Sequence, residues 1–210
     1  MSGFEDSLRE KILGTNAHAV IVDRAQRPIE GYDEVLQTVS RLPHVRAATP
    51  FIYSQVLLTA DANVHGVILR GIDPATEGTV TDIERNLVDG RLADLSNTFP
   101  PPADKPGLSP RSGIVIGKEL ALRLGVFMGD TLNVVSPRGT MGPFGMVPKL
   151  RPYQVVGIFD SGMYDYDSSI AYISLAQAQD FFQMGDAVTG VEIKGDEIFR
   201  AEAVASAAEA

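Results

Sequence analysis

A stretch rich in proline, glycine and methionine, residues 135–153, lies between two strand-like runs and limits the folds that this chain can adopt. The runs at 131–136 and 153–160 are rich in β-branched and apolar residues, as buried strands are. Two strands joined by such a stretch predict a long β-hairpin that projects from the body of the domain.

The centre of this stretch carries four large apolar residues among glycines and prolines: Met141, Phe144, Met146 and Val147. Exposed apolar patches mark interaction sites, and methionine adapts to varied partner surfaces. Prolines stiffen the stretch and reduce the entropy lost on binding: Pro137, Pro143, Pro148 and Pro152. Two interpretations stay open. The apolar residues bind a partner, or the hairpin folds back and buries Met141, Phe144 and Met146 against its own domain.

The charge of the stretch differs from that of the whole chain. The chain has 18 Lys and Arg against 27 Asp and Glu, a formal net charge of −9. Nucleic-acid binders need a basic patch to displace counterions, so this class of function is excluded. Between Asp130 and Asp160, however, no acidic residue occurs, whereas Arg138, Lys149 and Arg151 are present. A basic arm on an acidic body suits a partner with an acidic rim.

The rest of the chain predicts an α+β fold in two halves. Helices are predicted where apolar residues recur at helical spacing: 4–12, 35–42, 118–124, 175–183 and from 196 onward. Strands are predicted at 17–22, 45–50, 54–59, 64–72, 113–116, 170–173 and 188–193. Residues 73–110 contain many prolines and glycines and are predicted to form a long loop.

No motif of catalysis is complete. Residues 113–119 read GIVIGKE, but the glycines are too close for a phosphate-binding loop and Glu119 replaces its Ser or Thr. The chain has no cysteine, and its three histidines lie in separate predicted elements. Three acidic residues lie close together in one predicted turn: Asp160, Asp165 and Asp167. They form either a calcium site or an acidic turn exposed to solvent. The sequence therefore predicts a protein that is not an enzyme and needs no cofactor.

The chain lacks any run of about 18 apolar residues, which a membrane-spanning helix requires. Residues 201–210 read as an Ala/Glu helix without a cap or a stop signal. We therefore expect the chain to be a piece of a longer protein.

Several segments, in order and spacing, resemble permeases of the lipoprotein-releasing LolC/LolE family. Residues 1–19 read MSGFEDSLREKILGTNAHA, and residues 114–126 read IVIGKELALRLGV and are followed by GDTL at 129–132. Residues 153–159 read YQVVGIF, and residues 172–179 read YISLAQAQ. The resemblance covers nearly the whole chain.

This resemblance implies a MacB-like periplasmic core fold. Residues 1–72 and 186–210 would form a Porter-like α/β subdomain, and residues 73–185 a Sabre-like insertion. In this family the domain lies between the first two of four membrane helices and faces the periplasm of a diderm bacterium from the inner membrane.

The resemblance also implies a partner. LolC-type permeases have a protruding hairpin, the Hook, that recruits the periplasmic lipoprotein carrier (LolA-like), with a basic surface beside it that Arg151 matches. Residues 137–148 resemble the Hook, with bounding prolines Pro137 and Pro148, a central Pro143, and Phe144 followed by Gly145. Two features depart from the pattern: the arm is shorter, and Met146 stands where a basic residue is usual.

The further implied partners are a cytoplasmic ATPase subunit, a second permease and the lipoprotein substrate. Other interpretations remain open. The chain could be a MacB-like coupling domain of an exporter, part of a permease that activates a cell-wall hydrolase, or an enzyme.

Overall fold

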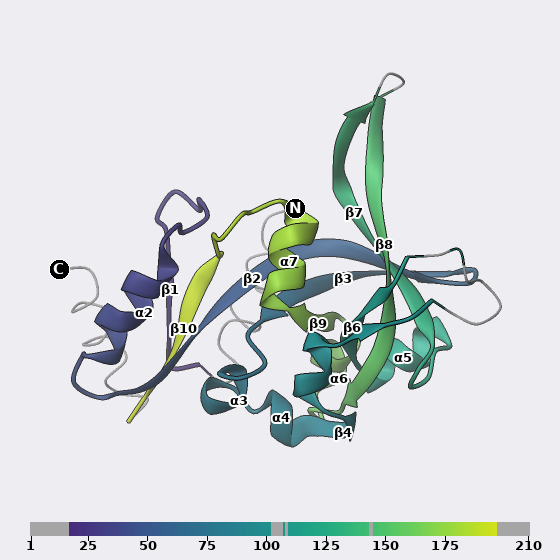
Figure 1. Cartoon of the computed structure of the whole chain (residues 1–210). Helices are drawn as coiled ribbons and strands as arrows, with labels where there is room; N and C mark the ends of the chain where they lie inside the picture. Colours follow the sequence, from purple (N-terminus) through teal and green to yellow (C-terminus); the bar gives the residue numbers. More distant parts are fainter. Residues whose placement is uncertain (1–16, 102–106, 108, 143–144, 197–210) are drawn as a thin grey trace. The chain divides into compact units, whose positions relative to one another are not determined.

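The computed structural model describes residues 17–101, 107, 109–142 and 145–196, with the backbone alone at 137–142 and 145–147. The chain divides into two compact units, each built from segments that are distant in sequence (Figure 1). The first unit contains the described parts of Met1–Ile52, Ile72–Arg85 and Ala178–Ala210, and the second those of Tyr53–Gly71 and Asn86–Gln177. The helices predicted at 4–12 and from 196 onward fall almost entirely outside the described residues.

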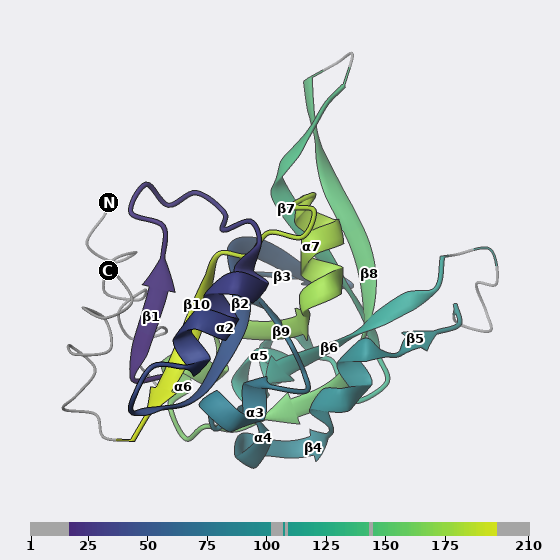
Figure 2. The same ribbon diagram turned by 60° about the vertical axis from the view of Figure 1, so that its left-hand side comes forward.

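The first unit contains a small antiparallel sheet with helix α2 (Tyr32–Ser40) packed against it (Figure 2). Strand β10 (Gly190–Gly195) lies between β1 (Ala19–Val22) and the first half of β2 (Val45–Ala60). Helix α2 begins after Gly31, whose positive φ of 63° suits a residue without a Cβ. Its apolar face packs on the sheet in a cluster that contains Val35, Leu36, Val39, Val191 and Ile193.

The strands of the second unit pair into a closed ring. In the order β2, β3, β9, β6, β8 and β7, each strand pairs with the next, and β7 pairs again with β2. The members after β2 are β3 (Asn63–Ile72), β9 (Ile170–Ser174), β6 (Arg111–Gly117), β8 (Gly145–Phe159) and β7 (Thr131–Gly142). The pair β6–β8 is parallel, so the sheet is mixed. Leu58, Val134 and Tyr153 are fully buried, because a small ring of strands is filled by its own side chains.

Three helices each follow a strand of this ring in the sequence. Helix α5 (Lys118–Leu124) follows β6, buries Leu120 and Leu124, and ends at Gly125, whose left-handed φ of 70° suits a residue without a Cβ. Helix α6 (Tyr164–Asp167) follows β8. Helix α7 (Leu175–Phe182) begins in the second unit and ends in the first.

The prediction of a loop at 73–110 is wrong. This region contains α3 (Glu77–Val80), α4 (Ile83–Asn86), β4 (Leu87–Gly90), the 3-10 helix η1 (Leu92–Ser96) and β5 (Thr98–Phe99). Val80, Ile83, Leu92 and Leu95 are buried within it. Elements this short offer less than two turns of periodicity, so their apolar residues give no helical or strand pattern.

The two strands predicted at 45–50 and 54–59 are one strand, β2, of 16 residues. Pro50 does not end it. Phe51 and Ile52, at the predicted break, are buried and continue the strand from the first unit into the second.

Candidate functional site

The predicted hairpin is present as the continuation of β7 and β8 beyond the ring (Figures 1 and 2). The two strands pair from Thr131↔Gln154 up to Gly142↔Gly145. The pairing with the neighbouring strands ends earlier along the hairpin. Strand β2 pairs with β7 only as far as Val135, and β6 pairs with β8 only from Tyr153. Within the described strand pairings, the two strands of the hairpin arm (residues 137–148) therefore pair only with each other.

The structure places most of the predicted binding residues on this arm or directly below it. Met141 lies opposite Met146 in the strand register, and Thr140 lies opposite Val147. Pro137 and Arg138 belong to β7, whereas Gly145, Pro148, Lys149 and Arg151 belong to β8. Pro143 and Phe144 lie outside the described residues. The binding role of these residues stays a prediction.

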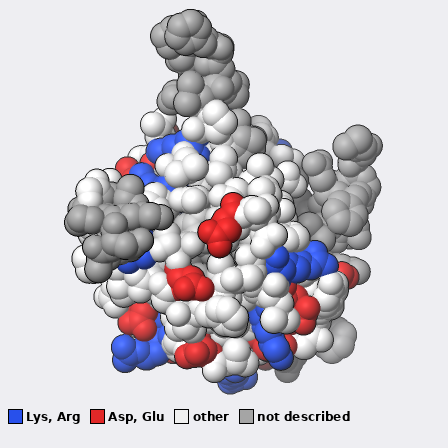
Figure 3. Space-filling model, turned by 90° about the vertical axis from the view of Figure 1, so that its right-hand side faces the viewer, with Lys and Arg blue, Asp and Glu red and all other residues white. Residues whose placement is uncertain are grey.

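The two basic residues below the arm share one face of the hairpin. Arg151 lies opposite Val134, which is buried inside the ring, and Lys149 is two residues away on the same strand. The Arg151 guanidinium donates a hydrogen bond of 3.3 Å to Oε1 of Gln177 on α7. On the face drawn in Figure 3, Lys and Arg side chains lie near the top of the described surface with Asp and Glu beside them, and both signs of charge also mix lower down. Gln177 is a contact that the sequence did not predict.

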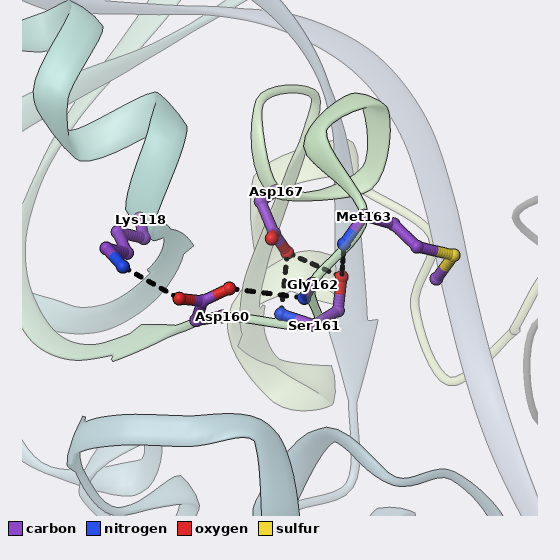
Figure 4. A network of polar contacts seen from close by, with 6 residues as sticks. All are labelled: Lys118, Asp160, Ser161, Gly162, Met163 and Asp167. Carbon is purple, nitrogen blue, oxygen red and sulfur yellow. Dashed lines mark hydrogen bonds and ion pairs between the residues drawn. The ribbon is translucent and has the colours of Figure 1, made fainter.

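The acidic turn that the sequence predicts as an ion site or a solvated turn forms a network of hydrogen bonds within the protein (Figure 4). Asp160 accepts hydrogen bonds from Lys118 Nζ at 2.8 Å and from the Gly162 N–H at 3.1 Å. The bond from Lys118 lowers the pKa of Asp160, and the same bond raises the pKa of Lys118.

Asp167, the third acidic residue of the turn, is buried. It accepts the Ser161 N–H at 2.9 Å and the Ser161 hydroxyl at 2.7 Å. No group of three or more acidic or histidine side chains suited to a metal ion occurs in the described part of the chain. The network fastens the end of β8 to the start of α5.

The glycines of the segment that resembles a phosphate-binding loop have a packing role. A Cβ at Gly117 would lie 2.0 Å from the carbonyl oxygen of Asp167, and a Cβ at Gly113 would lie 2.7 Å from that of Asp94. Lys118, at the position of a phosphate-binding lysine, is bonded to Asp160. The local geometry therefore accounts for all three residues without a nucleotide.

Comparison with known families gives the decisive match. The model of the MacB-like periplasmic core domain matches residues 1–210, the whole chain. The chain belongs to this family. Its α+β fold with a mixed sheet is thus the MacB-like fold that the sequence predicts, whereas the Porter-like and Sabre-like boundaries stay a prediction.

Relatives of this MacB-like domain include permeases of lipoprotein-releasing systems. The transmembrane protein LolC of Xylella fastidiosa is 31% identical over 206 residues, 98% of this chain and 46% of the relative. LolC of Neisseria meningitidis is 29% identical over 196 residues, 92% of this chain and 44% of the relative. LolE of Haemophilus influenzae is 29% identical over 206 residues. The resemblance to the LolC/LolE family is confirmed, and the chain spans less than half the length of these relatives.

Solved structures agree on the fold. The extracellular domain of the Gram-positive ABC-type transporter YknZ superposes with a TM-score of 0.52 at 13% identity, covering 91% of this chain and 81% of that one. The periplasmic region of MacB from Actinobacillus actinomycetemcomitans has a TM-score of 0.51 at 17% identity, covering 84% and 71%. None of the helices within the described residues has the length and apolarity needed to cross a membrane.

Proposed function

We propose that this MacB-like domain is the periplasmic part of a lipoprotein-releasing ABC permease, and that its hairpin arm recruits the periplasmic lipoprotein carrier. The domain itself catalyses no reaction. A cytoplasmic ATPase subunit hydrolyses ATP, a second permease completes the transporter, and the domain holds the carrier near the lipoprotein that leaves the inner membrane.

The observation that carries this proposal is the arm itself. Past Val135 on β7 and before Tyr153 on β8, the described pairings join these two strands only to each other. An isolated two-stranded hairpin is marginally stable in water, so an arm of this kind is retained for a contact with another molecule. Its sequence supplies the apolar anchors for such a contact in Met141, Phe144 and Met146.

The charge of the hairpin supports a carrier with an acidic rim. Lys149 and Arg151 share one face below the arm, and Arg138 is the basic residue within it. In contrast, the whole chain has a net charge of −9. A local basic surface on an acidic body orients a partner of opposite charge and accelerates its association.

The test is calorimetric titration of the domain with the lipoprotein carrier of the same organism. We expect saturable binding at micromolar concentration or tighter. The double variant Phe144→Ala/Met146→Ala should bind at least about tenfold more weakly, because truncating interface anchors costs more than about 1.4 kcal/mol.

The chain offers a matched control for this double variant. Phe127 and Met163 are a phenylalanine and a methionine of the second unit that lie outside the hairpin and are 72% and 44% exposed. The variant Phe127→Ala/Met163→Ala removes similar apolar area and should bind the carrier like the unmodified domain. Absence of binding by the folded, unmodified domain would overturn the proposal and leave a MacB-like coupling domain of an exporter or of a hydrolase-activating permease.

A further inference from the structure

The outer face of the ring below the hairpin arm is an uncovered surface without charge. Leu57 on β2 lies opposite Val135 on β7, and Val135 lies opposite Leu150 on β8. Residues directly opposite in antiparallel strands point to the same face, so these three side chains form one row. Leu57 is 41% exposed and Leu150 is 58% exposed.

A second row runs beside the first on the same face. Thr59 lies opposite Asn133, and Asn133 lies opposite Pro152. We name the two rows together the apolar outer face: Leu57, Thr59, Asn133, Val135, Leu150 and Pro152. None of these residues carries a charge.

The neighbouring strand β3 keeps this face open. A Cβ at Gly66 would lie 3.9 Å from a Leu57 methyl group, so Gly66 sits beside Leu57 without a side chain that could cover it. Val64, two residues away on the same strand and therefore on the same side, is 55% exposed. Exposed aliphatic side chains thus lie on β8, β2 and β3, and the half-buried Val135 of β7 lies between Leu150 and Leu57.

The opposite face of the same strands has a different chemistry. Leu58 and Val134 are buried there, and Arg151 and Lys149 follow them toward the arm. The base of the hairpin is therefore basic on one side and apolar on the other. A row of large aliphatic side chains left in water on a sheet marks a contact with another protein rather than a requirement of the fold.

We infer that the apolar outer face is a second part of the docking surface for the lipoprotein carrier, and that it binds an apolar patch on the carrier. This inference rests on the proposed function. Leu150 lies two residues from Pro148, the last residue of the arm, on the same strand β8, so the two positions share one face and the arm and the apolar outer face are continuous along it. A carrier that accepts acyl chains must itself present apolar surface around its binding cavity, which gives the two surfaces matching chemistry.

The experiment compares carrier binding by the unmodified domain and by the double variant Leu57→Thr/Leu150→Thr. Threonine keeps the preference for a strand and adds no charge, so it replaces apolar area with a smaller side chain that carries a hydroxyl. We expect the dissociation constant to rise about tenfold, as for the loss of interface anchors. The loss should persist at roughly 0.5 M salt, where surface charge contacts are screened.

The control is the double variant Val88→Thr/Leu122→Gln, at two exposed apolar residues of the second unit that lie outside the apolar outer face. It should bind like the unmodified domain. Circular dichroism verifies that each variant is folded. Unchanged binding by folded Leu57→Thr/Leu150→Thr, while Phe144→Ala/Met146→Ala loses binding, overturns this inference and leaves the proposed function standing.

Two other results also overturn the inference. If the Leu57→Thr/Leu150→Thr variant changes self-association in sedimentation experiments but not carrier binding, the face belongs to an interface between copies of the domain. If the unmodified domain does not bind the carrier, the proposed function fails and this inference fails with it.

Discussion

Substitution of Gly117 by alanine tests whether the segment around it serves packing. Real Cβ atoms essentially never come closer than 3.0 Å to another heavy atom, and here the new Cβ would lie 2.0 Å from the Asp167 carbonyl oxygen. The backbone of β6 or of α6 must therefore move by about 1 Å. Overpacking of this kind costs about 1–3 kcal/mol, and the shift also weakens the hydrogen bonds between Ser161 and Asp167.

We expect Gly117→Ala to lower the free energy of unfolding by about 3 kcal/mol. For a chain of this length this corresponds to a decrease in Tm of about 6–12 °C. Near-UV circular dichroism measures it in the second unit, because every tyrosine except Tyr32 belongs to that unit. Gly107→Ala is the control, since its added Cβ meets no atom within 4 Å, and it should leave Tm unchanged. A Tm for Gly117→Ala within about 2 °C of the unmodified protein would refute the packing argument.

Two further predictions concern the same network. Asp167→Ala leaves the half-buried N–H of Ser161 without its acceptor and should cost about 1–3 kcal/mol, measured by urea unfolding, and an unchanged midpoint would contradict it. The pKa of Asp160 is below its usual 3.8 because Lys118 donates to it, so its contribution to stability is complete above pH 3.8 and is lost as the pH falls through the lowered value. Asp160→Asn should therefore lower the urea midpoint at pH 6, and the difference from the unmodified protein should shrink on acidification below pH 3.8. A difference that is the same at both pH values would contradict this reasoning.

The hairpin and the helix after β6 could be predicted from the sequence because their signals are local. A stretch of prolines and glycines between two strand-like runs indicates a projecting hairpin, and a glycine directly after an apolar helical run, Gly125, is typical of a helix end. The missing acidic residues between Asp130 and Asp160 likewise showed that this hairpin is basic.

The short elements at 73–110 and the role of the glycines could not be predicted. Each element in that region spans too few residues for a periodic pattern, and its apolar residues are buried by contacts with other parts of the chain. Gly117 faces Asp167, a residue distant in sequence, so nothing near Gly117 in the chain shows that only a glycine fits.

By itself, the sequence determined which segment leaves the domain, the residues that this segment offers to a partner, and its local charge. Only the tertiary structure decided which residues share a face. The apolar outer face exists because β7 pairs with β2 on one side and β8 on the other, which places Leu57 beside Val135 and Leu150. A shift of one residue in either register would reverse the side chains of one strand, and the contacts that fix the register come from the whole closed ring rather than from any one strand.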